Sequence, residues 1–123
     1  MLTGQCLCGA VKYRYLAPLF ETIICHCKDC QIGQGTAFAF NSPIQKQYFV
    51  LDQGKSALKE YFFTPQKARV FCQHCGSPIY SYRLDVPETI RLRLGTVTDG
   101  LIPPPQEEFF VEHAFKFVLI QKN

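Results

Sequence analysis

The sequence predicts an all-β protein whose strands are held together by a structural zinc ion, and three observations support this. Short segments that are apolar, or that alternate apolar with polar side chains, recur along the 123 residues. None of them has the length or the period of a substantial helix. Seven cysteines fall into three tight groups with the spacings of thiolate metal ligands. The length and a hydrophobic fraction of 47% fit one domain, residues 1–123.

The first strands are predicted around the first two cysteine groups. Residues 7–15 alternate apolar with cationic side chains from Val11 to Tyr15. Residues 22–25 are β-branched and apolar, and a short helical turn is expected after Cys27. Gly33 to Gly35 should form a mobile loop, followed by a strand at 36–40 that ends at Asn41-Ser42-Pro43.

The second half of the chain predicts further short strands. They are expected at 48–51, 58–63, 68–71, 79–83 and 89–94, with a turn at 52–55. In the last of these strands Ile90, Leu92 and Leu94 alternate with Arg91 and Arg93. The three prolines at 103–105 should form a stiff connector, and 109–120 one long or two short strands.

Composition and charge argue against several classes of function. The net charge of +3 is modest and the lysines and arginines are dispersed, so no nucleic-acid partner is expected. The adjacent Glu107 and Glu108 are expected to be solvated. The N-terminus does not resemble a secretory signal, and no apolar run approaches the roughly 20 residues of a membrane span. We therefore expect a cytoplasmic protein, in which clustered cysteines are metal ligands more often than disulfides.

The three cysteine groups offer two metal sites of different kinds. They are Cys6-x-Cys8, Cys25-His-Cys27-x-x-Cys30 and Cys72-x-x-Cys75. Spacing alone does not decide which groups share a metal. The simplest allocation joins the first pair to the last pair as a saturated four-thiolate zinc site that ties sequence-distant strands together. Gly9 and Gly76 can supply the positive φ that such ligand turns need. The triplet would then hold a second zinc with one coordination position open.

A zinc ion with three thiolate ligands is expected to act on thiols. Three negative ligands overcompensate the charge of the metal, which makes it a weaker Lewis acid than a three-histidine zinc. Such a centre favours a soft fourth ligand, above all another thiol, and lowers the pKa of that thiol. The sequence therefore predicts a thiol substrate rather than hydrolysis.

Other polar residues are weaker candidates, and no catalytic residue is predicted beyond the triplet. His113 is the histidine that could complete the triplet site from a distance. His26 should point away from the metal, and His74 should be exposed. Lys28 and Arg69 are candidate cations for a substrate carboxylate, and otherwise they would be solvated surface charges.

The cysteine motifs make the chain resemble the glutathione-dependent formaldehyde-activating enzyme family, which also includes the centromere protein V domain. The resemblance rests on the segments 4–13 (GQCLCGAVKY), 25–30 (CHCKDC, followed by Gly33 and Gly35), 71–77 (FCQHCGS) and 95–99 (GTVTD). It implies coiled antiparallel sheets of the β-tent type and two zinc sites. The structural site would be Cys6, Cys8, Cys72 and Cys75, and the labile, catalytic-type site Cys25, Cys27 and Cys30.

The resemblance also implies a function. It is that of a carbon–sulfur lyase-type enzyme that acts on glutathione or a similar thiol and an aldehyde adduct, as in the formation of S-hydroxymethylglutathione. In this scheme the thiol enters the open position at the triplet, ionises and attacks the aldehyde carbon. The alternative is a thiol- or metal-binding carrier or interaction module without turnover. A purely structural zinc protein is a third hypothesis.

Overall fold

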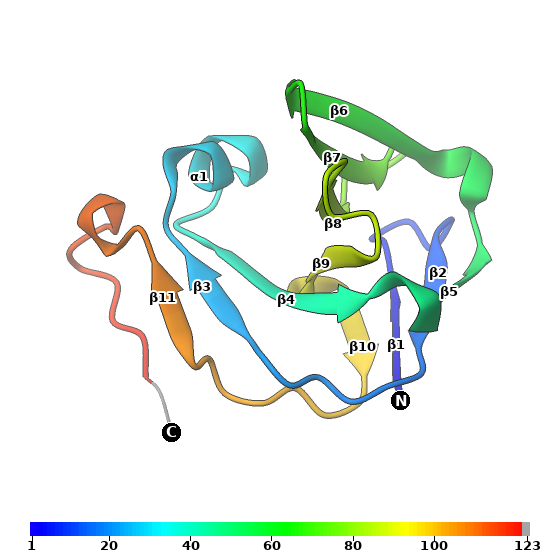
Figure 1. The fold of residues 1–123 in the computed structure, drawn as a ribbon, viewed down its shortest axis with the longest axis horizontal. Helices are drawn as coiled ribbons and strands as arrows, with labels where there is room; N and C mark the ends of the chain where they lie inside the picture. The colour runs from blue at the N-terminus through cyan, green and yellow to red at the C-terminus, as the bar shows by residue number, and fades with distance from the viewer. Residues whose placement is uncertain (122–123) are drawn as a thin grey trace.

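Two sheets build the protein in the computed structural model, which describes residues 1–121 (Figure 1). The last two residues of the predicted domain 1–123 lie outside the described part. The strands of the smaller sheet are β1 (Leu2–Gln5), β2 (Lys12–Tyr15), β5 (Phe49–Gln53) and β10 (Val97–Asp99). Those of the larger sheet are β3 (Ile23–Cys25), β4 (Ala39–Gln45), β6 (Leu58–Thr64), β7 (Lys67–Cys72), β8 (Pro78–Arg83), β9 (Thr89–Arg93) and β11 (Glu107–Phe109).

The strand order explains how distant segments meet. The smaller sheet runs β10-β1-β2-β5 and the larger one β11-β3-β4-β9-β8-β7-β6. Every pair in these sheets is antiparallel except β11 with β3, which is parallel. The helical segments are α1 (Lys28–Gln34) and the 3-10 turns η1 (Lys46–Tyr48), η2 (Lys55–Ala57), η3 (Leu94–Thr96) and η4 (Val111–His113). The predicted all-β, mainly antiparallel fold is confirmed, and so is the helical turn after Cys27.

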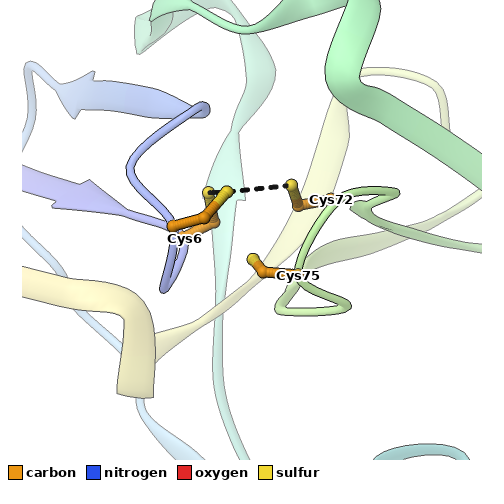
Figure 2. Close-up of side chains that lie close together, drawn as sticks. Cys6, Cys72 and Cys75 are labelled. Atoms are coloured by element: carbon orange, nitrogen blue, oxygen red, sulfur yellow. Dashed lines mark hydrogen bonds between the residues drawn. The ribbon is translucent and has the colours of Figure 1, made fainter.

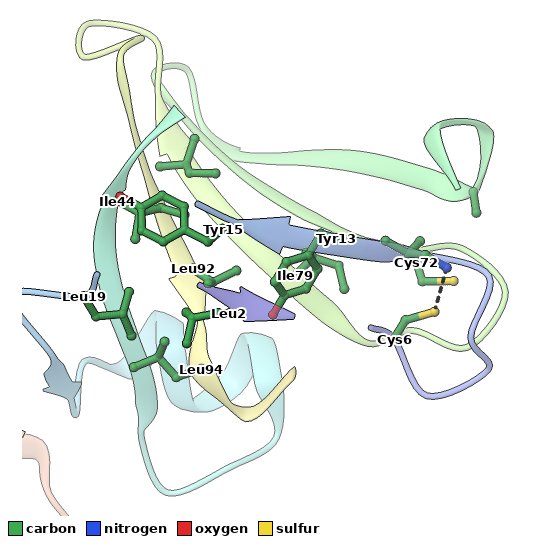
Figure 3. Close-up of a cluster of buried hydrophobic side chains, with 13 residues drawn as sticks. Leu2, Cys6, Tyr13, Tyr15, Leu19, Ile44, Cys72, Ile79, Leu92 and Leu94 are labelled. Carbon is green, nitrogen blue, oxygen red and sulfur yellow. Dashed lines mark hydrogen bonds between the residues drawn. The ribbon is translucent and has the colours of Figure 1, made fainter. Parts of the chain in front are cut away.

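The main core lies between the two sheets (Figure 3). Tyr13, Ile79 and Leu92 are at most 1% exposed. Burial raises the pKa of the Tyr13 phenol to about 12, and its hydroxyl lies 2.6 Å from Thr96 Oγ1. A second, smaller cluster of buried apolar side chains surrounds the cysteine triplet near β3. The core is therefore divided between the two cysteine-rich regions.

The two faces of the larger sheet differ in chemistry: one is apolar and the other carries cations. Cross-strand partners in antiparallel pairs share a face. In the row Val70, Tyr80 and Leu92, the last two side chains pack into the main core and Val70 is buried. The neighbouring row, Arg69 to Ser81 to Arg91, occupies the opposite face. Cations thus gather on the side of this sheet that faces away from the core.

Most predicted strands occur within two residues of their expected bounds, but three differ. Residues 7–11 form a turn rather than a strand. Strand β4 runs from Ala39 to Gln45 instead of the predicted 36–40. It can continue past Pro43 because β3 pairs with it only as far as Asn41 and leaves the proline unpaired on that side. The predicted strand at 109–120 stops at Phe109, because Phe110 adopts a positive φ of 58° and a 3-10 turn follows.

The predicted mobile loop at Gly33 to Gly35 is also wrong. Gly33 lies inside α1, and Gly35 ends that helix in the left-handed conformation with a φ of 64°. Strands β1 and β10 were not anticipated from the sequence. Within residues 1–121, no helix is both long enough and apolar enough to cross a membrane.

Candidate metal centres and the adjoining pocket

Four cysteines meet at one end of the main core, as the simplest allocation predicted. Cys6 and Cys8 come from the turn between β1 and β2. Cys72 ends β7 and Cys75 lies in the turn between β7 and β8; Figure 2 shows Cys6, Cys72 and Cys75. The four sulfurs lie within 4.8 Å of one another, with Cys6–Cys8 at 3.6 Å and Cys8–Cys72 at 3.8 Å. This cluster could hold a metal ion and would then connect the two sheets.

Backbone geometry on both turns prepares these sulfurs to bind a cation. Gly9 and Gly76 have φ values of 79° and 81°, which confirms the expected positive φ after each cysteine pair. The Val11 backbone N–H donates to Cys6 Sγ at 3.2 Å. This bond helps to lower the pKa of the Cys6 thiol even though burial acts to raise it.

The second turn stabilises a thiolate more strongly. The Ser77 hydroxyl lies 3.3 Å from Cys75 Sγ. Hydrogen bonds from the side chain and the backbone of Ser77 lower the pKa of the Cys75 thiol to about 5. Within the four-cysteine cluster the Cys75 thiol is thus the more acidic, whereas the pKa of the Cys8 thiol is raised to about 11.

The cysteine triplet lies where β3 passes into α1. Cys25 ends β3, Cys27 caps the helix and Cys30 lies in its first turn. The Cys30 backbone N–H donates to Cys27 Sγ at 3.2 Å. The sulfur of Cys30 lies 2.7 Å from that of Cys27 and 3.6 Å from that of Cys25. These three sulfurs also lie within 4.8 Å of one another and could hold a metal ion.

The triplet sulfurs do not ionise independently. The hydrogen bond between Cys25 and Cys30 is the largest cause of a lowered pKa at Cys25, and it raises the pKa of Cys30, as does burial. Burial also raises the pKa of Cys27. Three thiolates this close repel one another, so a cation is needed to hold all of them ionised. All seven cysteines of the described chain are free thiols.

A cavity of about 650 Å³ opens beside the triplet. All three triplet cysteines line it, together with residues of β4, β7, β8 and β9 and the segment after β11. None of the four other cysteines is among the described residues that line it. The two clusters therefore differ in access: the triplet faces a space that can hold a ligand, while the four-cysteine cluster lies at the end of the core.

Cations dominate the charged lining of this pocket. Among the described residues Asp29 is its one carboxylate. The cations are Lys28, Lys67, Arg69, Arg83, Arg91 and Arg93. Lys28 and Arg69, the two predicted candidates, are thus both at the pocket. Arg83 is already paired, since its guanidinium contacts Asp85 at 2.9 Å. The pocket as a whole favours an anionic ligand.

Arg93 is the most deeply placed of these cations, at 6% exposure. Its Nε donates to Gln34 Oε1 at 2.5 Å and its Nη1 to the Arg91 carbonyl at 3.1 Å. Burial, followed by repulsion from Arg69 and Arg91, lowers the pKa of the Arg93 guanidinium to about 10, while Cys30 and Cys25 act in the opposite direction. All three arginines line the same cavity as the cysteine triplet.

Arg69 reaches the triplet because Gly33 leaves room for it. A Cβ on Gly33 would lie 3.0 Å from the guanidinium carbon of Arg69. The same guanidinium lies over the Phe63 ring, 4.8 Å from the ring centroid. The side chain of Arg69 on β7 thus approaches the backbone of α1 at Gly33.

The predicted environments of the histidines and glutamates are partly wrong. His26 is buried and its Nε2 lies 3.0 Å from Glu108 Oε1, so Glu108 is not the solvated residue predicted, whereas Glu107 is exposed. His74 is exposed, as expected. His113 lines the pocket but belongs to neither cysteine cluster within the described chain.

The sequence does not predict the pocket face of the larger sheet. It predicts Arg91 and Arg93 only as the polar side of a strand, and Lys67 and Arg83 only as dispersed charges. The available signal was that cations recur at alternate positions opposite apolar residues, as in Lys67-Ala-Arg69 and Arg91-Leu-Arg93. The buried Asn41, which also lines the pocket, gave no such signal.

Comparisons with known proteins agree with this arrangement. The family described as "glutathione-dependent formaldehyde-activating enzyme" matches residues 1–113. An uncharacterized lyase of Schizosaccharomyces pombe is 27% identical over 77 residues, which is 63% of this chain and 54% of that protein. The chain thus aligns with about half of that relative. A crystal structure of a Rhodobacter sphaeroides protein superposes with a TM-score of 0.67 at 22% identity, covering 86% of this chain and 98% of that one.

Proposed function

Because this chain belongs to the glutathione-dependent formaldehyde-activating enzyme family, we propose that it is a zinc-dependent carbon–sulfur lyase-type enzyme. Its substrates would be glutathione or a similar thiol and an aldehyde, with S-hydroxymethylglutathione as the adduct formed from formaldehyde. The observation that carries the proposal is the three-sulfur cluster that opens onto a cation-lined pocket. The name of the fission yeast relative, an uncharacterized lyase, supports the same reaction class.

The donor set fits zinc. Zinc bound by sulfurs at about 2.3 Å in a tetrahedron separates them by about 3.8 Å. The Cys6–Cys8 and Cys8–Cys72 distances of 3.6 and 3.8 Å agree with that edge. Cys27 and Cys30, at 2.7 Å, would have to move apart by about 1 Å to share one ion. We assign a structural role to the four-cysteine cluster and a labile, catalytic-type role to the triplet.

Zinc held by three thiolates would supply affinity for a further thiol and would lower the pKa of that thiol. The protein's own residues would do the rest. Cations that line the pocket would bind carboxylates of the substrate, and the walls of the pocket would exclude water from the reacting groups. The thiol sulfur forms a bond to the aldehyde carbon, and the aldehyde oxygen takes up the proton that the thiol loses. The reaction is an addition in which nothing is oxidised or reduced.

The test must separate catalysis from binding, because thiols and formaldehyde react without a catalyst. Exchange NMR at equilibrium measures how fast free glutathione and its hydroxymethyl adduct interconvert. The zinc-loaded protein is expected to raise this exchange rate in proportion to its concentration. Cys27→Ser, which removes one sulfur from the triplet, should abolish the increase and leave the circular dichroism spectrum unchanged. Glutathione that binds without faster exchange would instead establish the alternative, a thiol-binding carrier module.

A further inference from the structure

The pocket contains more positive charge than a formaldehyde adduct of glutathione requires. Formaldehyde brings no charge. Glutathione brings two carboxylates and one ammonium group, a net charge of −1 while its thiol is protonated. The pocket offers six cations against Asp29 and against the net charge of −1 that the three triplet thiolates and one zinc ion would carry together. Only Arg83 among the cations forms an ion pair with a carboxylate in the described chain. The remaining positive charge indicates that the ligand carries a further acidic group.

Two polar residues that line the pocket, Asn41 and Arg93, are buried and have no acidic partner in the described chain; we call them the floor of the pocket. Asn41 and Arg93 are direct cross-strand partners on β4 and β9, and both line the cavity. They are 3% and 6% exposed. The buried Oδ1 of the Asn41 amide has no hydrogen-bond partner within the described chain. A buried amide in this state is costly unless a ligand satisfies it.

Arg69 completes this floor from the other wall of the pocket. It extends from β7 toward α1, where Gly33 makes room for its guanidinium. Arg69 and Arg93 line the same cavity as the three triplet cysteines. Arg91 also lines this cavity but is more exposed than either of them. The two less exposed arginines therefore belong to the cavity in which the carbon–sulfur bond would form.

The position of the cations indicates which reactant carries the additional acid. The carboxylates of glutathione lie at the ends of its two peptide arms, away from the sulfur. A carboxylate on the carbonyl compound would instead be attached to the same carbon that becomes bonded to sulfur. Planar guanidinium groups bind carboxylates through paired hydrogen bonds. The Asn41 Oδ1 can accept a hydrogen bond from the hydroxyl group that the adduct gains. Arg69 and Arg93 are thus placed for an acid on the carbonyl reactant.

We propose that the carbonyl reactant of this protein carries its own carboxylate, so that the pocket selects the adduct of glutathione with a 2-oxo acid such as glyoxylate. This inference rests on the proposed function. The sulfur bonds to the carbonyl carbon, the π electrons of the carbonyl move to its oxygen, and that oxygen takes the proton lost by the thiol. The carboxylate is unchanged, and no oxidant or reductant is consumed.

Two stable glutathione thioethers test the proposal by binding alone. S-(carboxymethyl)glutathione mimics the glyoxylate adduct, and S-(carbamoylmethyl)glutathione has nearly the same shape without the additional charge. Calorimetry on the zinc-loaded protein should show the carboxymethyl compound binding about tenfold more tightly or better, as expected for hydrogen bonds to a charged group. Arg69→Gln should remove that difference. Arg14→Gln, which breaks a pair with Asp52 on the smaller sheet, is the matched control and should retain it.

Equal affinities, or tighter binding of the carbamoyl compound, would overturn the proposal. So would an Arg69→Gln variant that weakens both compounds equally, because Arg69 would then serve the carboxylates of glutathione itself. If Arg69→Gln does not fold, the affinities of the two thioethers for the wild-type protein can be measured at rising salt concentration. The preference for the carboxymethyl compound should then fall as salt screens its additional charge, and a preference that salt does not change would overturn the proposal. Exchange NMR distinguishes a failure of the 2-oxo acid proposal from a failure of the proposed lyase-type function. Faster exchange with formaldehyde but not with glyoxylate refutes the 2-oxo acid alone, whereas no acceleration with either aldehyde refutes the proposed function as well.

Discussion

Removing one sulfur from each cysteine cluster should have opposite consequences, and Cys72→Ser against Cys27→Ser is the sharpest comparison. Cys72 is fully buried at the end of the main core and belongs to the cluster that connects the two sheets. A structural zinc site contributes about 10–16 kcal/mol to folding in small peptides. An ordinary domain has a net stability of only about 5–15 kcal/mol. Loss of this site should therefore leave Cys72→Ser unfolded.

Cys27→Ser should keep the fold. Cys27 is partly exposed at the start of α1, packs only against the small second core cluster and lines the pocket. Its replacement should cost about 1 kcal/mol, as is typical of point substitutions. Elemental analysis of the purified proteins should give about two zinc ions per wild-type chain and about one in Cys27→Ser, with thermal unfolding followed by circular dichroism. An unfolded Cys27→Ser, or a stable Cys72→Ser lacking its zinc, would refute the division into structural and labile sites.

Three further predictions follow from the same geometry. A chelator should remove about one zinc per chain, from the pocket-facing triplet, with no change in the circular dichroism spectrum; simultaneous loss of both ions and of the fold would contradict this. Gly4→Ala should cost about 1–3 kcal/mol in chemical unfolding, since its Cβ would meet the Tyr13 ring and lie 2.6 Å from the Thr96 carbonyl, whereas Gly95→Ala, with open space around it, should be nearly neutral. Glu108→Ala should cost about 1–3 kcal/mol because it leaves buried His26 without its partner, while exposed Glu107→Ala should change little, and equal effects in the two variants would argue against the pair.

The cysteine clusters could be predicted from the sequence because their geometry is local. A C-x-C on an extended segment and a C-x-x-C in a turn each bring two sulfurs together whatever the rest of the fold does. The pairing of Cys6 and Cys8 with Cys72 and Cys75 was the simplest allocation of four ligands, and the family resemblance implied the same set, although spacing alone did not decide it. The triplet likewise followed from three sulfurs within six residues. These features required no knowledge of how the strands are ordered.

The pocket could not be predicted in the same way because it depends on strand order. Arg69 and Arg93 are distant in sequence, and they approach only because β8 lies between β7 and β9 and the sheet brings β7 against α1. The burial of His26 has the same origin. It depends on β11 returning to pair in parallel with β3, which carries Glu108 to the imidazole. Dispersed charges in a sequence can thus converge on one sheet face.

The alternation of the larger sheet also separates stability from ligand recognition. Along β9, Ile90 and Leu92 pack into the core, while Arg91 and Arg93 between and beside them line the pocket. The same division holds on β7, where Ala68 and Val70 are buried and Lys67 and Arg69 face the cavity. Successive side chains of one strand point to opposite faces of the sheet. One of two neighbouring residues therefore contributes to the stability of the core and the other to ligand binding in the pocket. Substitutions at 67, 69 and 91 can change the charge of the ligand that is selected while the core remains intact.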